Sequence, residues 1–157
     1  MAFIIRPLAQ HDKPAVMGIL RSTQEFEPAE VPVAEEVLDS CLASPGNGYQ
    51  SLVAEEHGAP LGFICFGMIP LTIAAYDVYW LAVKKGQRRQ GVGRALLVKA
   101  ETEIKIAGGY LVLIETSSKP GYRPARSFYR RCGYQAVSRI RDFYAPGDHR
   151  VTFAKKL

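Results

Sequence analysis

Three glycines and three arginines gather in one short segment, residues 83–94, and this combination suits the binding of a phosphate. The segment separates a strand-like apolar run from a helix-like run. The first turn of a helix has free N–H groups and a partial positive charge, and both favour an anion. Gly91 and Gly93 lack a Cβ, so the backbone can approach a phosphate closely, and neighbouring arginines supply charged donors. The segment therefore predicts a pyrophosphate site at a helix N-terminus.

Two common phosphate-binding loops do not fit this segment. A P-loop needs Lys and then Ser or Thr directly after its last glycine, whereas Gly93 is followed by Arg94 and Ala95. A dinucleotide-binding loop needs a third glycine three residues further on, where this chain has Leu96. A basic turn that only precedes a helix is the other interpretation, and the loop by itself does not decide between the two.

A second patterned segment follows later in the chain, after another predicted helix and strand. Residues 125–134 read A-x-x-F-Y-x-x-x-G-Y, and residues 88–93 read R-R-Q-G-V-G. Both patterns, in this order, resemble the two signature motifs of the GNAT superfamily of acetyltransferases. The order of strands also resembles that family along nearly the whole chain, least clearly in the two N-terminal helices. The resemblance implies a single domain over residues 1–157 with a mixed α/β fold, in which a mostly antiparallel sheet of about seven strands is joined by about four helices.

The resemblance also implies acetyl-CoA as the acetyl donor and assigns residues to it. In the family, the strand before the first motif binds the pantetheine arm and the motif binds the pyrophosphate. The expected contacts are Leu81, Ala82 and Val83 for the pantetheine, and Arg88, Arg89, Gln90, Gly91, Val92, Gly93 and Arg94 for the phosphates. Many members have an asparagine where this chain has Tyr122, so we expect Ser117 or Ser118 to replace that contact. No metal is expected.

Tyr129 is the residue of the second motif that the resemblance assigns to catalysis. In the family, the tyrosine at this position lies near the CoA sulfur and can protonate the departing thiolate. Its ordinary pKa of about 10 keeps it a proton donor at neutral pH. A tyrosine whose ring only packs in the core is the alternative interpretation.

The acceptor amine needs a base, because an alkyl amine with a pKa of about 10 is protonated at neutral pH. Several family members have a carboxylate four residues before the L-A-V segment, and here that residue is Asp77. Glu115, on a neighbouring strand, is the alternative base, and Asp77 would then only orient the substrate. Strict alternation along the strand would place odd-numbered residues 77–83 on one face, so that one of Tyr79 and Trp80 lines the cleft and the other is core.

Residues near both ends of the chain are candidates for the acceptor pocket. Asp142, Tyr144 and Asp148 lie in the last predicted strands, which in GNAT folds flank that pocket, and they could bind an amine. The segment Glu25-Phe26-Glu27, between the first two helices, could close the other side. Turn or surface residues are the alternative interpretation of each.

Hydrophobic periodicity predicts the elements that must position these residues. Strands are expected at 3–6, 50–56, 61–69, 76–83, 110–116, 135–141 and 150–154, and helices after Asp12, at 30–43, from Arg94 to about 107, and at 124–131. Asp12 is expected to cap the first helix, and residues 44–48 to end the second. The apolar face of the second helix is expected to contain Val33, Val37, Leu38 and Cys41.

Composition narrows the class of protein. With 48% hydrophobic and 22% charged residues and no long apolar run, the chain predicts a soluble, cytoplasmic protein without a membrane partner. The net charge of +5 suits an anionic partner. The basic residues concentrate at 84–94 and 123–131, where a cofactor explains them better than nucleic acid does. Three separate cysteines predict neither a disulfide framework nor a zinc site.

The sequence therefore predicts an N-acetyltransferase that moves acetyl from acetyl-CoA to a primary amine of a small molecule, by direct transfer in a ternary complex. Acetylation of a protein N-terminus or lysine is the alternative activity. A module that binds acyl-CoA without catalysis is the alternative outside enzymology. The fold is often dimeric, so a homodimer is left open, although no segment indicates one.

Overall fold

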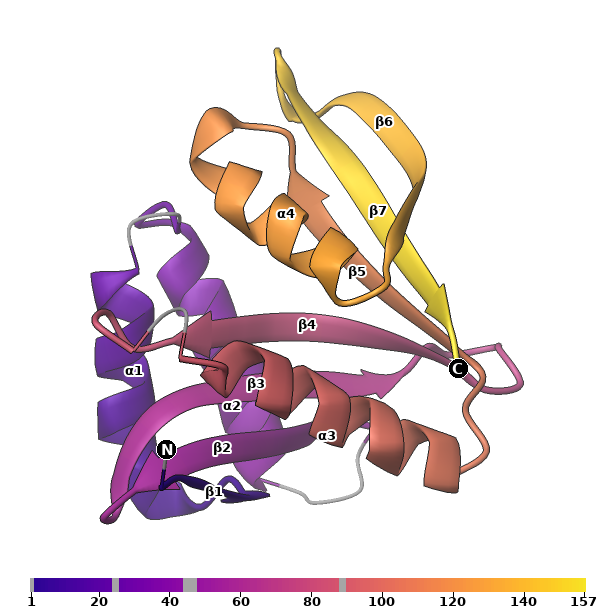
Figure 1. The fold of residues 1–157 in the computed structure, drawn as a ribbon. Helices are drawn as coiled ribbons and strands as arrows, with labels where there is room; N and C mark the ends of the chain where they lie inside the picture. Colours follow the sequence, from indigo (N-terminus) through magenta and orange to yellow (C-terminus); the bar gives the residue numbers. More distant parts are fainter. Residues whose placement is uncertain (1, 24–25, 44–47, 88–89) are drawn as a thin grey trace.

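The computed structural model describes residues 2–23, 26–43, 48–87 and 90–157 (Figure 1). Its strands are β1 (Ile4–Pro7), β2 (Gln50–Glu56), β3 (Ala59–Met68), β4 (Ala75–Val83), β5 (Leu111–Ser117), β6 (Gln135–Ala145) and β7 (Asp148–Lys156). Its α-helices are α1 (Lys13–Ser22), α2 (Glu30–Ala43), α3 (Val92–Ile106) and α4 (Arg123–Arg131), and short 3-10 helices cover Gln10–Asp12 and Pro120–Tyr122. Within the described ranges, no helix is long and apolar enough to cross a membrane.

All seven strands belong to one sheet, in the order β1-β2-β3-β4-β5-β7-β6. Neighbouring strands pair antiparallel except β4 and β5, which run parallel because α3 connects them as a crossover. The prediction of a mixed, mostly antiparallel sheet of seven strands with four helices is confirmed for the described part of the chain.

Helices cover both faces of the sheet and form two hydrophobic cores (Figure 1). Side chains alternate along β3, so Ile64 and Phe66 pack on the face covered by α3 and α4, while Phe63 and Cys65 pack on the face covered by α1 and α2. All four are at most 1% exposed, which explains why β3 reads as a continuous apolar run. One edge of β4 is paired with this buried strand, which fixes the position of β4 in the sheet.

Some elements differ from the prediction. The helix α3 begins at Val92 rather than Arg94, because Gly91 adopts the left-handed conformation (φ +83°) and serves as its N-cap. On α2, the buried face contains Ala34, Leu38 and Cys41, whereas Val33 is 53% exposed and lies off that stripe. The predicted turn after α2 lies outside the described residues except for Gly48.

A charged cluster fixes the start of the chain to the sheet. The Arg6 guanidinium donates to both carboxylate oxygens of Asp12 at 2.8 and 2.9 Å, and to Glu55 at 2.9 Å. Asp12 also accepts the backbone N–H of Ala9 at 2.8 Å, so its side chain does not cap α1 as predicted. The Arg6 guanidinium holds the pKa of Asp12 below its ordinary value.

Arg6→Ala is expected to lower the free energy of unfolding by about 2–4 kcal/mol, because it leaves the buried Asp12 carboxylate without its partner. Urea unfolding at pH 7 measures this loss. Stability from this pair is present above the unfolded pKa of Asp12 and is lost as pH falls through the lower folded pKa. Lys13→Ala, which removes an exposed contact to Glu35 and Asp39, is the control and should cost far less. Equal losses in the two variants would contradict the assignment.

Candidate active site

The cleft of the molecule opens where β4 and β5 separate. Residues Ala75–Val78 of β4 pair with Leu111–Ile114 of β5, and among the described residues the pairing of the two strands ends there. Beyond that point β4 continues beside β3, while β5 turns away with β7, and α4 lies across the opening (Figure 1). The cleft measures about 1380 Å³. It exceeds the roughly 300–1,000 Å³ of a typical small-molecule pocket.

A β-bulge in β4 changes which side chains face the cleft. Cys65 pairs with Trp80 and Phe66 with Val78, so Tyr79 is the extra residue. Tyr79 and Trp80 consequently both pack toward the α1 and α2 side, and both line the cleft. The predicted strict alternation is therefore wrong after Val78.

The bulge changes the face on which the odd-numbered residues of β4 lie. Leu81 and Val83 pack with the core under α3, on the face opposite to Tyr79, whereas strict alternation would have placed them together. Ala82 is buried against the α1 and α2 core. All three residues of the Leu81–Val83 segment border the cleft, next to the first turn of α3.

Two carboxylates, Asp77 and Glu115, line the middle of the cleft. Asp77 is half-buried, and burial together with the negative charge of Glu115 raises its pKa to about 6, against a smaller lowering effect of Arg150. Glu115 is 44% exposed and lies 3.8 Å from Arg150. A raised pKa near 6, as Asp77 has, is a property that a base working near neutral pH needs.

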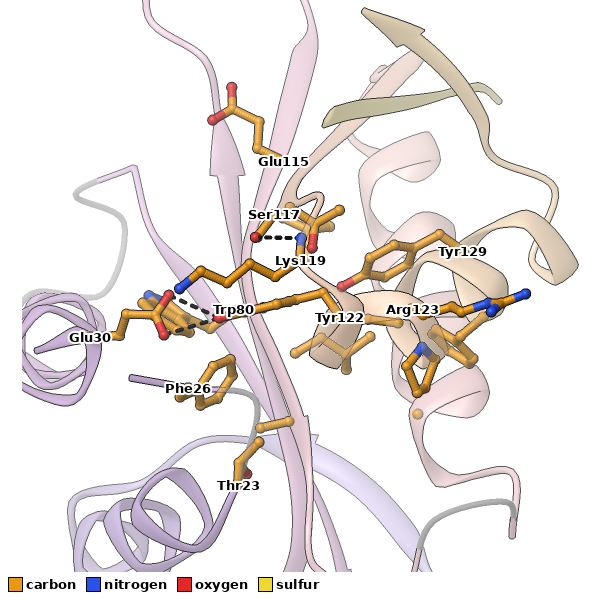
Figure 2. A pocket seen from close by; sticks show the side chains of 18 of the residues that line it. Thr23, Phe26, Glu30, Trp80, Glu115, Ser117, Lys119, Tyr122, Arg123 and Tyr129 are labelled. Carbon is orange, nitrogen blue, oxygen red and sulfur yellow. Dashed lines mark hydrogen bonds between the residues drawn. The ribbon is translucent and has the colours of Figure 1, made fainter. Parts of the chain in front are cut away.

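Tyr129 reaches the same cleft from α4, and Figure 2 shows its hydroxyl end directed away from the helix into the opening. Its ring contacts Phe128, Tyr134 and Phe153 at centroid distances of 5.7, 6.4 and 5.7 Å. Burial raises the pKa of Tyr129 to about 12. The ring contacts fix the side chain, and no hydrogen bond joins its hydroxyl to another of the described residues.

The first turn of α3 lies at the other end of the cleft, where Gly91, Gly93 and Arg94 line it. Gly91 is the N-cap of the helix and, because it has no side chain, it offers no side-chain acceptor to the N–H groups of the first turn. A Cβ on Gly93 would lie 3.4 Å from Val83 and 3.5 Å from Phe128, so the glycine keeps open the space between β4 and α4. These residues border the cleft at the start of a helix, and their contact with a phosphate stays a prediction.

The other residues predicted to bind phosphate do not all turn a side chain toward the cleft. Val92 is 1% exposed, so its side chain belongs to the core and only its backbone could face a phosphate. Gln90 is exposed, and its side chain donates to the Gly86 carbonyl at 3.4 Å. Arg88 and Arg89 lie outside the described residues, as does Glu25 of the expected acceptor pocket.

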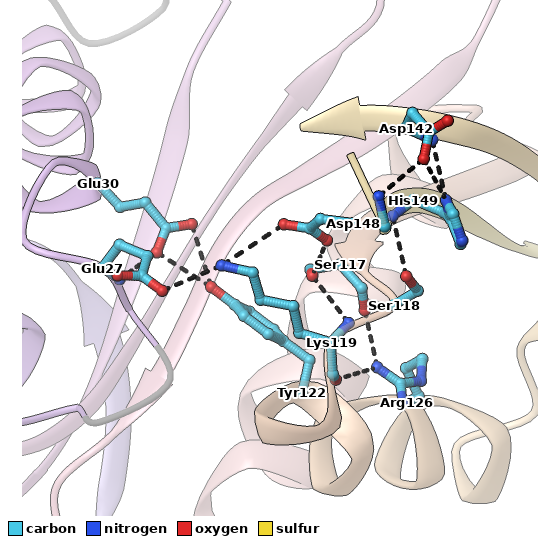
Figure 3. Close-up of polar contacts among 11 residues, drawn as sticks. Glu27, Glu30, Ser117, Ser118, Lys119, Tyr122, Arg126, Asp142, Asp148 and His149 are labelled. Carbon is cyan, nitrogen blue, oxygen red and sulfur yellow. Dashed lines mark hydrogen bonds and ion pairs between the residues drawn. The ribbon is translucent and has the colours of Figure 1, made fainter. Parts of the chain in front are cut away.

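Ser117 lines the cleft, but its hydroxyl is already engaged. It bonds to the Asp148 carboxylate and accepts the N–H of Lys119 at 3.0 Å. Arg126 donates to the Ser117 carbonyl at 2.8 Å and so attaches this turn to α4 (Figure 3). The expected cofactor contact of Ser117 stays a prediction, and the visible role of its side chain is to hold the β5–α4 turn.

A polar network crosses one end of the cleft (Figure 3). Tyr122 donates to the Glu30 carboxylate at 3.0 and 3.1 Å, and Lys119 pairs with Glu27 at 3.1 Å and with Asp148 at 3.6 Å. These contacts join the start of α2 to the β5–α4 turn and to β7. Sequence reasoning missed Glu30 and Lys119, because nothing in a single sequence brings these distant segments together.

The candidates for the acceptor pocket divide into two groups. Phe26, Glu27, Tyr144 and Asp148 line the cleft, and Asp148 is 7% exposed rather than a surface residue. Asp142 is not among the lining residues: its carboxylate accepts the N–H of Gly147 at 2.8 Å within the β6–β7 turn. Among the described residues, no three His, Cys, Asp or Glu side chains gather as a metal site would require.

Comparison with known proteins decides the family. The family profile described as "Acetyltransferase (GNAT) domain" matches residues 47–136, which is more than half of the chain. A crystal structure from Desulfovibrio desulfuricans, assigned to the GNAT family, is 34% identical, with a TM-score of 0.94 and 99% of both chains covered. The chain belongs to the GNAT family of acetyltransferases. It is therefore an acyltransferase of a family that uses acetyl-CoA.

Two more distant acetyltransferase structures share the fold and are named for different substrates. The ribosomal-protein-S18-alanine N-acetyltransferase of Escherichia coli is 20% identical (TM-score 0.79; 99% of this chain and 94% of that chain). The aminoglycoside 6'-N-acetyltransferase of Enterococcus faecium is 18% identical (TM-score 0.76; 98% and 96%). No curated protein matches the chain by sequence. These likenesses establish the fold and leave the acceptor open.

Proposed function

We propose that this GNAT protein transfers the acetyl group of acetyl-CoA to a primary amine of a small molecule, by direct attack while both substrates are bound. One observation carries the proposal: a carboxylate with a pKa of about 6 and a tyrosine hydroxyl enter the same cleft from opposite elements, β4 and α4. An amine deprotonated on one side and a thiolate leaving on the other need that arrangement.

The residues of the cleft fit the donor substrate. Acetyl-CoA supplies an activated thioester and carries phosphates that need an anion site. The N–H groups of the first turn of α3, with Arg94 beside them, would hold the pyrophosphate. The unpaired edge of Leu81–Val83, past the end of the β4–β5 ladder, would hydrogen-bond the amide-containing arm.

Each catalytic side chain has one task in this proposal. Asp77 takes a proton from the acceptor ammonium, directly or through a water, and is about nine-tenths ionised at pH 7 with a pKa of about 6. Tyr129 donates a hydrogen bond to the sulfur as negative charge develops on it. Trp80 and Phe26, whose rings meet edge-on at 5.1 Å, form an apolar wall beside the acceptor.

The closed acceptor end favours a small amine over a peptide. The Glu30–Tyr122 and Glu27–Lys119 contacts cross from the start of α2 to the β5–α4 turn, so an extended chain would have to displace them. Glu27, Glu30 and Asp148 also make this end acidic, which suits a protonated amine.

Calorimetry with acetyl-CoA, free CoA and ATP tests the binding step. Acetyl-CoA and CoA are expected to bind saturably and ATP much more weakly. Gly93→Leu should weaken acetyl-CoA binding roughly 100-fold, because its side chain would fill the space between Val83 and Phe128. Gly18→Leu is the matched control, since Gly18 is exposed on α1 with no atom near its Cβ position, and its affinity should be unchanged. Equal affinity in both variants would contradict the cradle.

Thiol release tests the transfer step. Small primary amines and short peptides would be compared as acceptors at saturating acetyl-CoA. Release that depends on a small amine supports the proposal. Release with peptides alone would assign the protein to N-terminal or lysine acetylation, and tight acetyl-CoA binding without release would indicate a binding module.

A further inference from the structure

Two of the three cysteines meet inside the protein although they lie far apart in the sequence. Cys41 is on α2 and Cys65 is on β3, and their sulfur atoms are 3.8 Å apart. Both thiols are free, with Cys41 7% exposed and Cys65 fully buried. A disulfide has a sulfur separation of about 2.0 Å, so the two sulfur atoms must move closer before a bond can form.

The two thiols are chemically unequal. Hydrogen bonding with Cys65 and Ser51 lowers the pKa of Cys41, against the opposing effect of its burial. The neighbouring Cys41 sulfur and burial raise the pKa of Cys65. A thiolate is the nucleophile in cysteine oxidation, so Cys41 is the sulfur that reacts first and Cys65 is the one that resolves the product.

We propose that Cys41 and Cys65 form a redox-modification site, which closes to an intramolecular disulfide when the protein meets a hydroperoxide. The Cys41 thiolate attacks the O–O bond, which gives a sulfenic acid and releases hydroxide. The Cys65 sulfur then attacks the Cys41 sulfur, the S–S bond forms, and the S–O bond breaks with loss of water. The two thiols lose two electrons in total, and hydrogen peroxide gains them to become two waters.

The site is joined to the acceptor side of the cleft. Cys65 is the strand partner of Trp80, at the β4 bulge, and Trp80 packs against the same core as both cysteines. The helix of Cys41 begins at Glu30, which bonds Tyr122 across the cleft. A disulfide would therefore fix α2, whose first residue reaches across the cleft, to β3, the strand beside β4.

Two residues of the chain serve to monitor oxidation: Trp80 as a fluorescent reporter and Cys132 as a reference thiol. Trp80 is the single tryptophan, so a disulfide at Cys65 is expected to change its fluorescence. Cys132 lies in the other core region, beside α4, and gives an internal reference thiol.

The experiment treats the reduced protein with a slight excess of hydrogen peroxide, alkylates the remaining thiols and maps the peptides by mass spectrometry. We expect loss of two of the three free thiols, a cross-linked Cys41–Cys65 peptide lighter by two hydrogens, and an altered Trp80 emission that dithiothreitol restores. Cys65→Ala should abolish both changes, whereas Cys132→Ser should keep them. These readouts need neither acetyl-CoA nor an acceptor, so their failure is independent of the proposed function.

Two results would overturn the proposal. One is oxidation of Cys132 or formation of a sulfinic acid at Cys41 without any Cys41–Cys65 peptide. The other is a fluorescence change that persists in Cys65→Ala. Peptide mapping on the unmodified chain decides the question even where a cysteine variant does not fold.

Discussion

Asp77→Asn is expected to lower kcat/KM by roughly 10²–10⁴ at neutral pH, the range that a positioned base contributes. It should also remove an inflection near pH 6 from the pH profile of kcat/KM. With a pKa of about 6, Asp77 is ionised above that pH, and below it the fraction able to accept a proton falls tenfold with each pH unit. The profile would be measured by thiol release with the acceptor found among small amines. An inflection unchanged in Asp77→Asn would remove Asp77 from the role.

Glu115→Gln distinguishes the two carboxylates. The charge of Glu115 is one of the causes that raise the pKa of Asp77, so its removal should move the inflection to lower pH and leave the rate at pH 7.5 nearly unchanged. If Glu115 were the base, this variant would lose the inflection altogether. The two assignments of the base therefore predict different results for Glu115→Gln: a shifted inflection if Asp77 is the base, and no inflection if Glu115 is.

Stability gives an independent check on Asp77. Its folded pKa lies above the ordinary value of about 3.9, so the folded state binds this proton more tightly than the unfolded state does. The group therefore favours folding at low pH and costs stability as pH rises through about 6. Asp77→Asn should be more stable than the parent at pH 8, by on the order of 1–2 kcal/mol. A loss of activity with a gain of stability cannot come from unfolding.

The sequence predicts local geometry well where one element decides it. The glycine pair of the loop at 90–94 predicts a helix start that can meet an anion, and the structure places that start at Val92 with Gly91 in a left-handed conformation. The apolar run at 61–69 predicts a strand, and the structure has β3 at Ala59–Met68. Each result depends only on backbone preferences and on the periodicity of apolar side chains.

Contacts between distant segments could not be predicted from one sequence. In the β4 bulge, Tyr79 has no pairing partner on β3. Two adjacent aromatic residues fit a strand pattern whether or not a bulge is present, so the sequence does not reveal it. Glu30 reads as an ordinary first-turn helix residue until the fold brings Tyr122 within 3.0 Å. Likewise, Cys41 and Cys65 are far apart in the sequence, and only the packing of α2 on β3 brings them together.

Tyr129→Phe is expected to lower kcat by roughly 10–100-fold while the acetyl-CoA dissociation constant stays the same. The ring contacts to Phe128, Tyr134 and Phe153 survive the change, so only the hydroxyl is lost. Single-turnover thiol release and calorimetry on the same preparation separate the two quantities. Tyr134→Phe is the matched control, because its hydroxyl donates to Glu101 at 2.7 Å outside the cleft. That variant should lose stability and keep kcat.

The size of the Tyr129 effect follows from the two proton affinities involved. Burial raises the pKa of Tyr129 to about 12, whereas an ordinary thiol has a pKa of about 8.5. Full proton transfer from the phenol to a thiolate is therefore uphill by roughly 3–4 pKa units, or about 5 kcal/mol. A hydrogen bond that strengthens as charge develops on sulfur requires no such transfer, and it explains a moderate loss rather than an inactive enzyme. A small solvent isotope effect on kcat, similar in the parent and in Tyr129→Phe, would support hydrogen bonding. A large effect that disappears in Tyr129→Phe would instead show that the proton moves.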